Sequence, residues 1–281
     1  MKKSSMELIS TFIVKHIFFL RFKVAQLTKK SKICKKIIKK LLFDKDETYF
    51  IPNNNSITKE EIININKEIP QNQEEIILPS NILKEVIKKA DDIVIMNTCL
   101  CRISTNCKNY PQDLGCIFLG KATHKISRDF CKEATKEEAI KHVDKCTKAG
   151  LTHIIGRNKL DSIWMNARPK EELLTICNCC PCCCLWNVLP NLDEDISNKF
   201  FKLPGIEIRY DPEKCINCKK CLDNCFTKAI TYTNNQITIN NKICKGCGRC
   251  ATTCPTESIK ISYNDKSINN IIERIDNLVK K

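Results

Sequence analysis

The most restrictive feature of this sequence is a cysteine pattern that occurs twice near the carboxyl end. Each copy reads Cys-x-x-Cys-x-x-Cys-x-x-x-Cys, and the first cysteines of the two copies, Cys215 and Cys244, lie 29 residues apart. Three thiolates on one tight loop can hold three corners of an iron–sulfur cubane, while the displaced fourth cysteine serves the neighbouring cluster. The two loops must therefore fold against each other.

This crossed arrangement predicts eight ligands for two [4Fe-4S] clusters. We expect cluster one to be held by Cys215, Cys218, Cys221 and Cys254. We expect cluster two to be held by Cys244, Cys247, Cys250 and Cys225. The fourth cysteine of each copy is expected to begin a helix. Gly246 and Gly248 should relax the second loop, so that backbone N–H groups can approach the cluster sulfurs.

The residues around the two copies predict a small module from Gly205 to Asp265. Ala229 to Ile239 predicts a hairpin that turns at Asn234-Asn235, and Ser258 to Ser262 predicts a strand after the second copy. The module resembles the bacterial two-cluster ferredoxin family. That resemblance implies two bound [4Fe-4S] clusters and the transfer of single electrons.

The module departs from the ferredoxin pattern at one position. Proline usually follows the fourth cysteine of each copy, as at Pro255, but Phe226 stands there in the first copy. This change affects the entry to the next segment and removes no ligand. Zinc is the alternative metal, but zinc sites use pairs of Cys-x-x-Cys and close at four ligands. Triplets with a displaced fourth cysteine favour iron–sulfur clusters.

Ten further cysteines lie upstream in two bursts, over residues 99–116 and 177–184. Buried cysteine is common in protein cores, but six cysteines within eight residues beside a proline have no ordinary packing explanation. We therefore expect a further metal or iron–sulfur site. Its candidate ligands are Cys99, Cys101, Cys107, Cys116, Cys177, Cys179, Cys180, Cys182, Cys183 and Cys184. A third cubane on the first burst, a set shared by both bursts and an unusual multi-iron cluster all remain open.

Three other cysteines, Cys34, Cys131 and Cys146, stand apart, and Cys146 has the helical spacing of a core residue. Arg102 lies beside the candidate ligands. It could donate hydrogen bonds to sulfur, bind an anionic substrate or form a surface ion pair.

The segment 49–204 predicts a small α/β domain that carries these bursts. The expected elements are a helix from Ser80 or Asn81 through Ala90, a strand over Asp92–Asn97, a helix with a capping box at Thr135 and Glu138, and strands over Leu151–Ile155 and Leu173–Ile176. Each burst follows a strand, and sites are often built at strand ends. The fold class is therefore α+β, with a small α/β N-terminal domain followed by a ferredoxin-like 2[4Fe-4S] module.

The net charge of +15 is concentrated in residues 1–45, where 13 Lys and Arg stand against two acids and give +11. Ile33, Ile37 and Leu41 share one helical face with lysines opposite, so we expect a basic amphipathic helical arm over residues 1–48. Such an arm can pack on the next domain, lie on an anionic membrane surface or dock on an acidic partner. No aromatic and basic interleaving supports nucleic-acid binding.

The expected domains are 1–48 for the arm, 49–204 for the cysteine-rich domain, 205–265 for the ferredoxin module and 266–281 for a C-terminal helix. Disulfides do not explain the 21 cysteines. No signal peptide is visible, the number is odd, and neighbours in the runs are too close to pair comfortably. We expect reduced, metal-bound cysteine in the cytoplasm of an anaerobe, with the arm as a means of peripheral attachment to the inner face of the membrane.

A second resemblance extends over most of the chain from about Tyr49. It rests on Asn97-Thr98-Cys99-Leu-Cys101-Arg102, Tyr110-Pro111, Gly115-Cys116, Glu137-Glu138-Ala139, Gly150-Leu151 and the Cys177 to Cys184 run. These residues resemble a group of largely uncharacterised ferredoxin-domain proteins of anaerobic archaea and bacteria. The resemblance implies iron–sulfur electron transfer without an assigned reaction.

Three functions fit the sequence. The chain can be an electron-transfer protein that serves a redox partner protein, a reductase whose centre is the upstream site, or a metal-handling or redox-sensing protein with a transiently loaded cysteine run. A nucleotide-dependent reductase is disfavoured, because neither G-x-G-x-x-G nor G-x-x-x-x-G-K-[ST] occurs and the chain has only seven glycines. Electron transfer needs no feature beyond the motifs.

Overall fold

The structure is a computed structural model that describes the chain outside residues 1–4, 43–45, 54–56, 58–78, 264–265 and 279–281. Residues 5–17, 42, 79–80 and 266–270 are described by their backbone only. The α-helices are α1 Ser5–Lys30, α2 Lys32–Leu42, α4 Pro79–Lys89, α5 Leu100–Ser104, α6 Lys136–Lys148, α7 Lys159–Trp164, α8 Glu194–Ser197, α9 Lys220–Asn224, α10 Arg249–Thr252 and α11 Lys266–Asp276. Short 3₁₀ helices are η2 Lys121–Lys125, η3 Lys170–Glu172 and η4 Leu185–Asn191.

The strands form one large sheet and two small ones. Their bounds are β1 Thr48–Ile51, β2 Ile93–Met96, β3 Ile117–Leu119, β4 Cys131–Glu133, β5 Thr152–Gly156, β6 Leu174–Cys179, β7 Phe200–Lys202, β8 Glu207–Tyr210, β9 Ile230–Thr233, β10 Gln236–Ile239 and β11 Ile259–Ser262. The large sheet has the order β4-β2-β3-β6-β5-β1-β7. Its neighbours pair antiparallel except β1 and β7, which pair parallel.

These elements confirm the α+β class. The predicted helix after Thr135 is α6, and its capping box is present: the Thr135 hydroxyl accepts from the Glu138 N–H, and the Glu138 carboxylate accepts from the Thr135 N–H. Within the sheet, however, the strand–helix–strand order does not give parallel neighbours. The reason is that α6 connects β4 with β5, which are not adjacent in the strand order.

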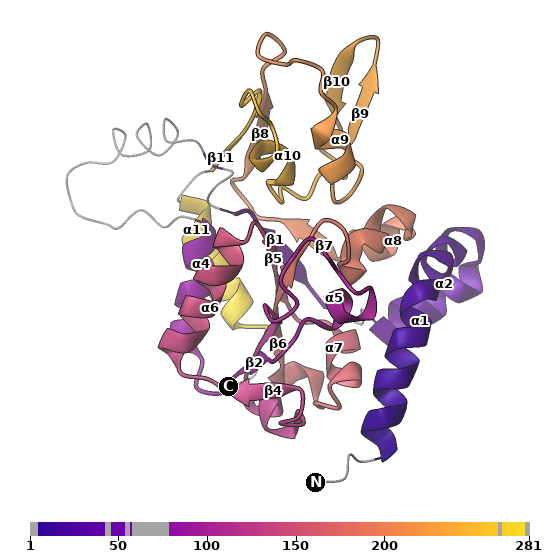
Figure 1. Cartoon of the computed structure of the whole chain (residues 1–281), viewed down its shortest axis with the longest axis vertical. Coiled ribbons are helices and arrows are strands. Elements are labelled where there is room, and N and C mark those ends of the chain that lie inside the picture. Colours follow the sequence, from indigo (N-terminus) through magenta and orange to yellow (C-terminus); the bar gives the residue numbers. More distant parts are fainter. Residues whose placement is uncertain (1–4, 43–45, 54–56, 58–78, 264–265, 279–281) are drawn as a thin grey trace, which may run out of the picture.

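Successive side chains along each strand point to opposite faces of the sheet, and each face packs in its own core. Tyr49 and Ile51 face a core that also contains side chains of α4, α6 and α11, whereas Phe50 between them faces a second core with η4 and α8. In Figure 1 α4, α6 and α11 stand together on one side of the sheet. The opposite face is therefore the one open to the upstream cysteines and to the arm.

The arm consists of α1 and α2 and packs against this opposite face. Phe22, Ala25 and Ile38 contact its apolar core, and the Lys35 ammonium lies 3.1 Å from Asp193 and 2.8 Å from Asp195. Not all of the arm is covered, because Ile33 and Ile37 are exposed. Among the described residues, no helix combines the length and apolar character that crossing a membrane requires.

The carboxy-terminal module has the predicted strands. β9 and β10 form the hairpin, with Asn234 and Asn235 both at positive φ, and β11 pairs antiparallel with β8. One expectation is wrong: the fourth cysteines do not begin helices. Cys225 directly follows the last residue of α9 and caps that helix, and Cys254 follows α10 after one residue. The third cysteine of each copy lies on the helix instead, so the helix turns the fourth thiol away from its own loop.

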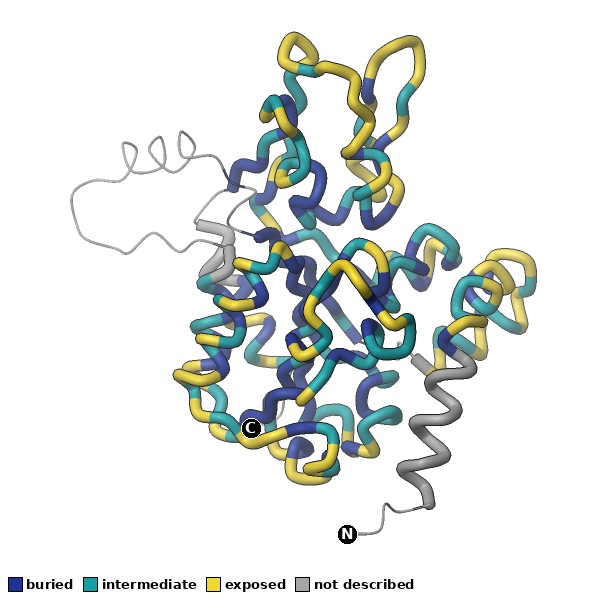
Figure 2. Tube along the Cα trace, viewed as in Figure 1, coloured by how far each residue is buried: buried dark blue, intermediate teal, exposed yellow. Residues whose placement is uncertain are grey.

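The module shares a hydrophobic core with the large sheet. Ile206, Ile261 and Tyr263 are buried in the same core as α4 and the large sheet. Figure 2 shows buried residues continuing from the sheet into the base of the module, while its outer loops are exposed.

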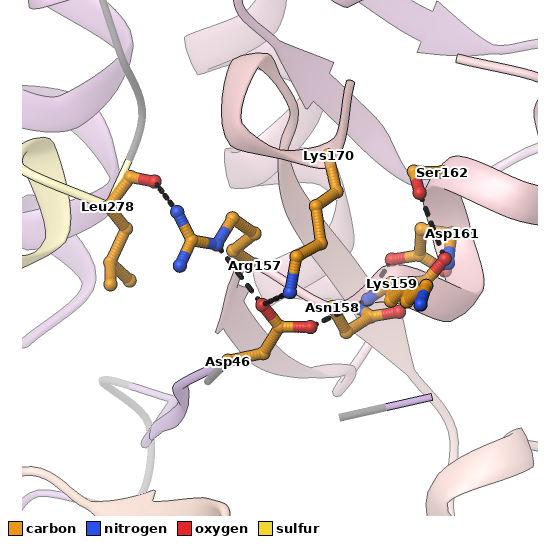
Figure 3. Close-up of polar contacts among 8 residues, drawn as sticks. All are labelled: Asp46, Arg157, Asn158, Lys159, Asp161, Ser162, Lys170 and Leu278. Atoms are coloured by element: carbon orange, nitrogen blue, oxygen red, sulfur yellow. Dashed lines mark hydrogen bonds and ion pairs between the residues drawn. The ribbon is translucent and has the colours of Figure 1, made fainter. Parts of the chain in front are cut away.

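Asp46 joins three distant parts of the chain. Its carboxylate, 1% exposed, lies 3.2 Å from the Arg157 Nε and 2.8 Å from the Lys170 Nζ, and it accepts a hydrogen bond from the Lys159 N–H (2.9 Å). Arg157 also donates to the Leu278 carbonyl after α11 (2.7 Å). Figure 3 shows these contacts beside the Asn158 cap of α7. The segment after the arm, the β5–α7 loop and the C-terminal end are thus held together.

Candidate metal centres

The four cysteines predicted for cluster one line a single pocket in the module. Cys215, Cys218, Cys221 and Cys254 meet there, with Ile237 and Thr256 completing the walls. Cys254 comes from the other copy of the pattern, so cysteines of both copies line this pocket. The Ser258 N–H donates to the Cys254 sulfur (3.3 Å), a contact that favours a thiolate.

The four cysteines predicted for cluster two are also neighbours. Burial raises the pKa of the Cys250 thiol, and the charges of Cys247, Cys244 and Cys225 raise it further, which places Cys225 beside the second loop. The Ala229 N–H donates to the Cys225 sulfur (3.2 Å). Four thiols that oppose each other's ionisation need a cation between them to become thiolates together.

The two loops share a backbone conformation that the sequence revealed only in part. Gly246 and Gly248 have φ of 63° and 81°, and the equivalent Asn217 and Lys219 have φ of 55° and 60°. A side chain at Gly246 would also meet Lys202, whose Cγ lies 2.8 Å from the added Cβ. Gly246 therefore permits both the loop and its close approach to β7.

Sheet register brings the two upstream bursts together. Ile117 pairs with Ile176 across the antiparallel strands β3 and β6, so Cys116, just before β3, lies opposite Cys177 of β6. Asn178 donates from Nδ2 to the Gly115 carbonyl (2.7 Å), and its Oδ1 accepts from Nδ1 of the buried His153 ring (2.7 Å). Burial lowers the pKa of His153 to about 4, so the ring is neutral at pH 7.

Seven cysteines line one pocket beside these strands, and the seventh, Cys180, belongs to a second set described below. We call the pocket the six-thiol pocket after the other six, Cys99, Cys101, Cys116, Cys177, Cys179 and Cys184. They interact in a continuous order, Cys99 with Cys101, Cys101 with Cys184, Cys184 with Cys179, Cys179 with Cys177 and Cys177 with Cys116. The other four upstream candidates, Cys107, Cys180, Cys182 and Cys183, gather in a second set beside it, which we call the outer thiol group.

Buried positive charge surrounds the six-thiol pocket. Arg102 is 0% exposed, and its guanidinium donates to the carbonyls of Asn178 (2.9 Å) and Leu114, while its Nε has no hydrogen-bond partner. No carboxylate of the described residues lies within ion-pair distance of it. Burial lowers the pKa of Arg102, but the charges of Cys99 and Cys180 raise it more. The surface ion pair considered for Arg102 is therefore wrong.

A buried guanidinium is costly unless negative charge faces it. The thiols are the groups that face Arg102, so metal-bound thiolates would supply that charge. Burial raises the pKa of Cys184, yet its neighbours Cys101 and Cys179 and the charge of Arg249 lower it to about 6 overall. The pKa values of the other five cysteines are raised, so a bound cation is needed for all six to become thiolates together.

Arg249 and Phe226 connect the module with this pocket. Arg249, next to Cys250, donates to the Cys179 carbonyl (3.0 Å) and lies 4.2 Å above the Phe226 ring. Phe226 is buried and meets Phe50 of the large sheet edge-on at 4.9 Å between ring centroids. Cys247 packs against the apolar cluster that contains Cys179 and Cys184. The second cysteine set and the six-thiol pocket are therefore neighbours.

Sequence reasoning missed several residues of this region. Arg21 of α1 interacts with Cys101 and Cys184, and burial lowers its pKa. Asp161 of α7 is buried and lines the pocket, and burial raises its pKa. Phe226 was visible as a departure from the ferredoxin pattern, but its anchoring role was not. Of the cysteines that stand apart, Cys146 is buried in a core as expected, next to Cys107 and Cys180.

Comparison with known families supports a ferredoxin-type assignment of the module. Residues 214–258 match the family model described as a 4Fe-4S dicluster domain. The chain therefore carries an iron–sulfur ferredoxin domain at its carboxy-terminal end. No curated protein and no solved structure matches the chain. The match begins at residue 214, after the upstream domain, so it does not support the resemblance over the rest of the chain.

Proposed function

We propose that this chain is an iron–sulfur electron-transfer protein with two [4Fe-4S] clusters in the module and a further cluster in the six-thiol pocket. Cluster one would be held by Cys215, Cys218, Cys221 and Cys254. Cluster two would be held by Cys244, Cys247, Cys250 and Cys225. Such clusters, when bound, supply one-electron transfer. The protein supplies the thiolates, the N–H donors to sulfur and the buried positive charge.

One observation carries the proposal: the second cysteine set of the module contacts the six-thiol pocket. Cys247 packs against the cluster of Cys179 and Cys184, and Arg249 donates to the Cys179 backbone. Two redox groups held this close can exchange electrons without a substrate or a moving part. The first cysteine set lies nearer the exposed end, where Cys218 and Ile216 are exposed. A redox partner protein would approach there.

Metal analysis of the full chain, prepared without oxygen, tests the proposal. We expect clearly more than eight irons per chain with matching inorganic sulfide, because each [4Fe-4S] cluster contains four irons. Replacing Cys179 and Cys184 together by Ala should lower the content to about eight, and the EPR signals of the module should persist. Cys131→Ala is the matched control, since Cys131 is buried outside both thiol sets.

Two results would contradict parts of this proposal. About eight irons in the unmodified chain would show that the upstream cysteines hold no iron–sulfur cluster. Zinc in place of iron in the module would contradict the ferredoxin assignment. The full chain is needed because the module shares its core with the large sheet.

A reductase is the second candidate, favoured by Asp161. This buried carboxyl lines the same pocket as the six thiols and is held by Asn158, whose Nδ2 donates to it (2.6 Å). A carboxyl group beside a redox centre could move a proton to a bound substrate. If the chain is a reductase, the chemically reduced protein should be oxidised by a small-molecule acceptor over multiple turnovers. Asp161→Asn should lose this turnover while its iron content stays unchanged. Unchanged turnover in that variant would exclude this role for Asp161.

We also propose that the arm attaches to an anionic membrane surface. The described part of α2 exposes Ile33, Ile37 and Leu41, which lie four residues apart on one stripe, with Lys36 and Lys40 along one side of it. Basic helices with an exposed apolar stripe bind anionic interfaces. The ion pairs of Lys35 with Asp193 and Asp195 keep the other side of α2 on the protein.

A further inference from the structure

The outer thiol group has a geometry different from that of the six-thiol pocket. The sulfurs of Cys107, Cys180, Cys182 and Cys183 all lie within 4.8 Å of one another. The Cys182 sulfur is 3.6 Å from Cys107, 3.8 Å from Cys180 and 3.4 Å from Cys183. Three of the four come from the turn that follows β6, and Cys107 comes from the segment after α5.

These distances fit one ion and do not fit a cubane. Four sulfurs about 2.3 Å from a tetrahedral Zn²⁺ stand roughly 3.8 Å apart from each other. In a cubane each thiolate binds a different iron, so its four sulfurs must spread around the whole cluster. The observed separations are also far too long for disulfides, whose sulfurs are about 2.0 Å apart. The outer thiol group is therefore arranged as a mononuclear tetrathiolate site.

Two groups face the Cys180 sulfur. The Cys183 N–H donates to the Cys180 sulfur (3.3 Å), and the buried Arg102 lies close enough to Cys180 for that cysteine to raise its pKa. Cys107, Cys180 and Cys183 are buried, whereas Cys182 is exposed and opens the site to solvent on one side. An ion can therefore enter through the Cys182 side without unfolding the chain.

We propose that Cys107, Cys180, Cys182 and Cys183 bind a single tetrahedral transition-metal ion, Zn²⁺ or Fe²⁺, separate from the group in the six-thiol pocket. Four protein ligands close the coordination sphere, so the ion is structural. It fixes the turn after β6 to the segment after α5. Because Cys180 also lines the six-thiol pocket, the ion stiffens the wall of that pocket. This inference does not depend on electron transfer.

Metal analysis of single variants tests the site. In the full chain, Cys182→Ser and Cys107→Ser should each lose one zinc or one iron per chain, with inorganic sulfide unchanged. Cys34→Ser is the control, because Cys34 lies on α2 away from both thiol sets, and it should lose nothing. Cys182→Ser is the safer variant, since an exposed serine at this position leaves no buried hydroxyl.

Cobalt provides a second readout. Protein produced with Co²⁺ should show the visible absorption of one tetrahedral cobalt tetrathiolate, and Cys182→Ser should lower its intensity or change its shape. Loss of about four irons together with sulfide from Cys182→Ser would show that these thiols hold a cubane and would overturn the proposal. Unchanged zinc, iron and cobalt in both variants would overturn it as well. These outcomes do not depend on the electron-transfer proposal. Loss of the single ion leaves inorganic sulfide unchanged, whereas loss of an iron–sulfur cluster lowers it.

Discussion

At the scale of single residues, one positive side chain contacts both the module and the six-thiol pocket. Arg249 lies between the module and the six-thiol pocket, where it donates to Cys179 and covers the Phe226 ring. Burial raises the pKa of the Cys247 thiol, and the charge of Arg249 opposes that rise. Arg249 therefore stabilises negative charge on the cluster-two side of the module.

Replacing Arg249 tests this role. In Arg249→Gln, reduction of cluster two adds an electron without the compensating charge, so its reduction potential should become more negative, on the order of tens of millivolts. Iron content should not change, because Arg249 is no ligand. Redox titration followed by EPR measures the shift. Arg209→Gln, at an exposed position of β8, is the control and should shift the potential much less. An unaltered potential in Arg249→Gln would remove the electrostatic role.

The residue scale also shows what sequence can and cannot predict about the site. The crossed sets of Cys215 and Cys244 follow from local spacing, because the loop geometry is contained in a dozen consecutive residues. The division of the upstream cysteines into six and four does not. It depends on β3 meeting β6 in one register, which sets Cys116 against Cys177, and that pairing spans sixty residues. Phe226 likewise finds Phe50 only through long-range packing.

At the scale of elements, local signals placed individual helices and strands but not their neighbours. The Thr135 capping box and the Asn234-Asn235 turn are each encoded within a few residues, so the sequence predicts them correctly. The strand order β4-β2-β3-β6-β5-β1-β7 carries no local signal. It joins strands far apart in the sequence, and side chains of α4 and α6 pack in the core on one face of the sheet.

The arm gives the prediction at this scale. Full-length protein should sediment with anionic vesicles at low salt and much less at high salt, because screening weakens the attraction of the lysines. Ile37→Ser should weaken binding about tenfold or more, since burying an isoleucine contributes about 1.5–3 kcal/mol. Ile243→Ser is the control, because Ile243 is exposed in the module and far from α2 in sequence. Equal binding to neutral vesicles, or none at all, would show that the exposed stripe has another purpose.

At the scale of the whole molecule, the module, the sheet and the arm form one packed unit around the thiols. The module contributes Ile261 and Tyr263 to the core of the sheet, and the arm contributes Arg21 beside Cys101 and Cys184. The described parts of the arm and of the module therefore both pack on the cysteine-rich domain. Cys99, Cys179 and Cys184 of the six-thiol pocket are buried, and charges act more strongly at buried positions than in water.

Asp46 helps to hold this packed unit together and provides the last prediction. Its buried carboxylate faces both Arg157 and Lys170, so Asp46→Ala removes one buried ion-pair partner from each of the two cations. Breaking a buried pair costs about 3–5 kcal/mol, and the urea midpoint of the anaerobic full-length protein should fall accordingly. Glu207→Ala removes the exposed partner of Arg209, 3.7 Å away, and should change stability by less than about 0.5 kcal/mol. Because Arg157 also binds the Leu278 carbonyl, Asp46→Ala should expose the C-terminal end to proteases first. Equal midpoints for the two variants would mean that the arm, the β5–α7 loop and α11 are held by apolar packing alone.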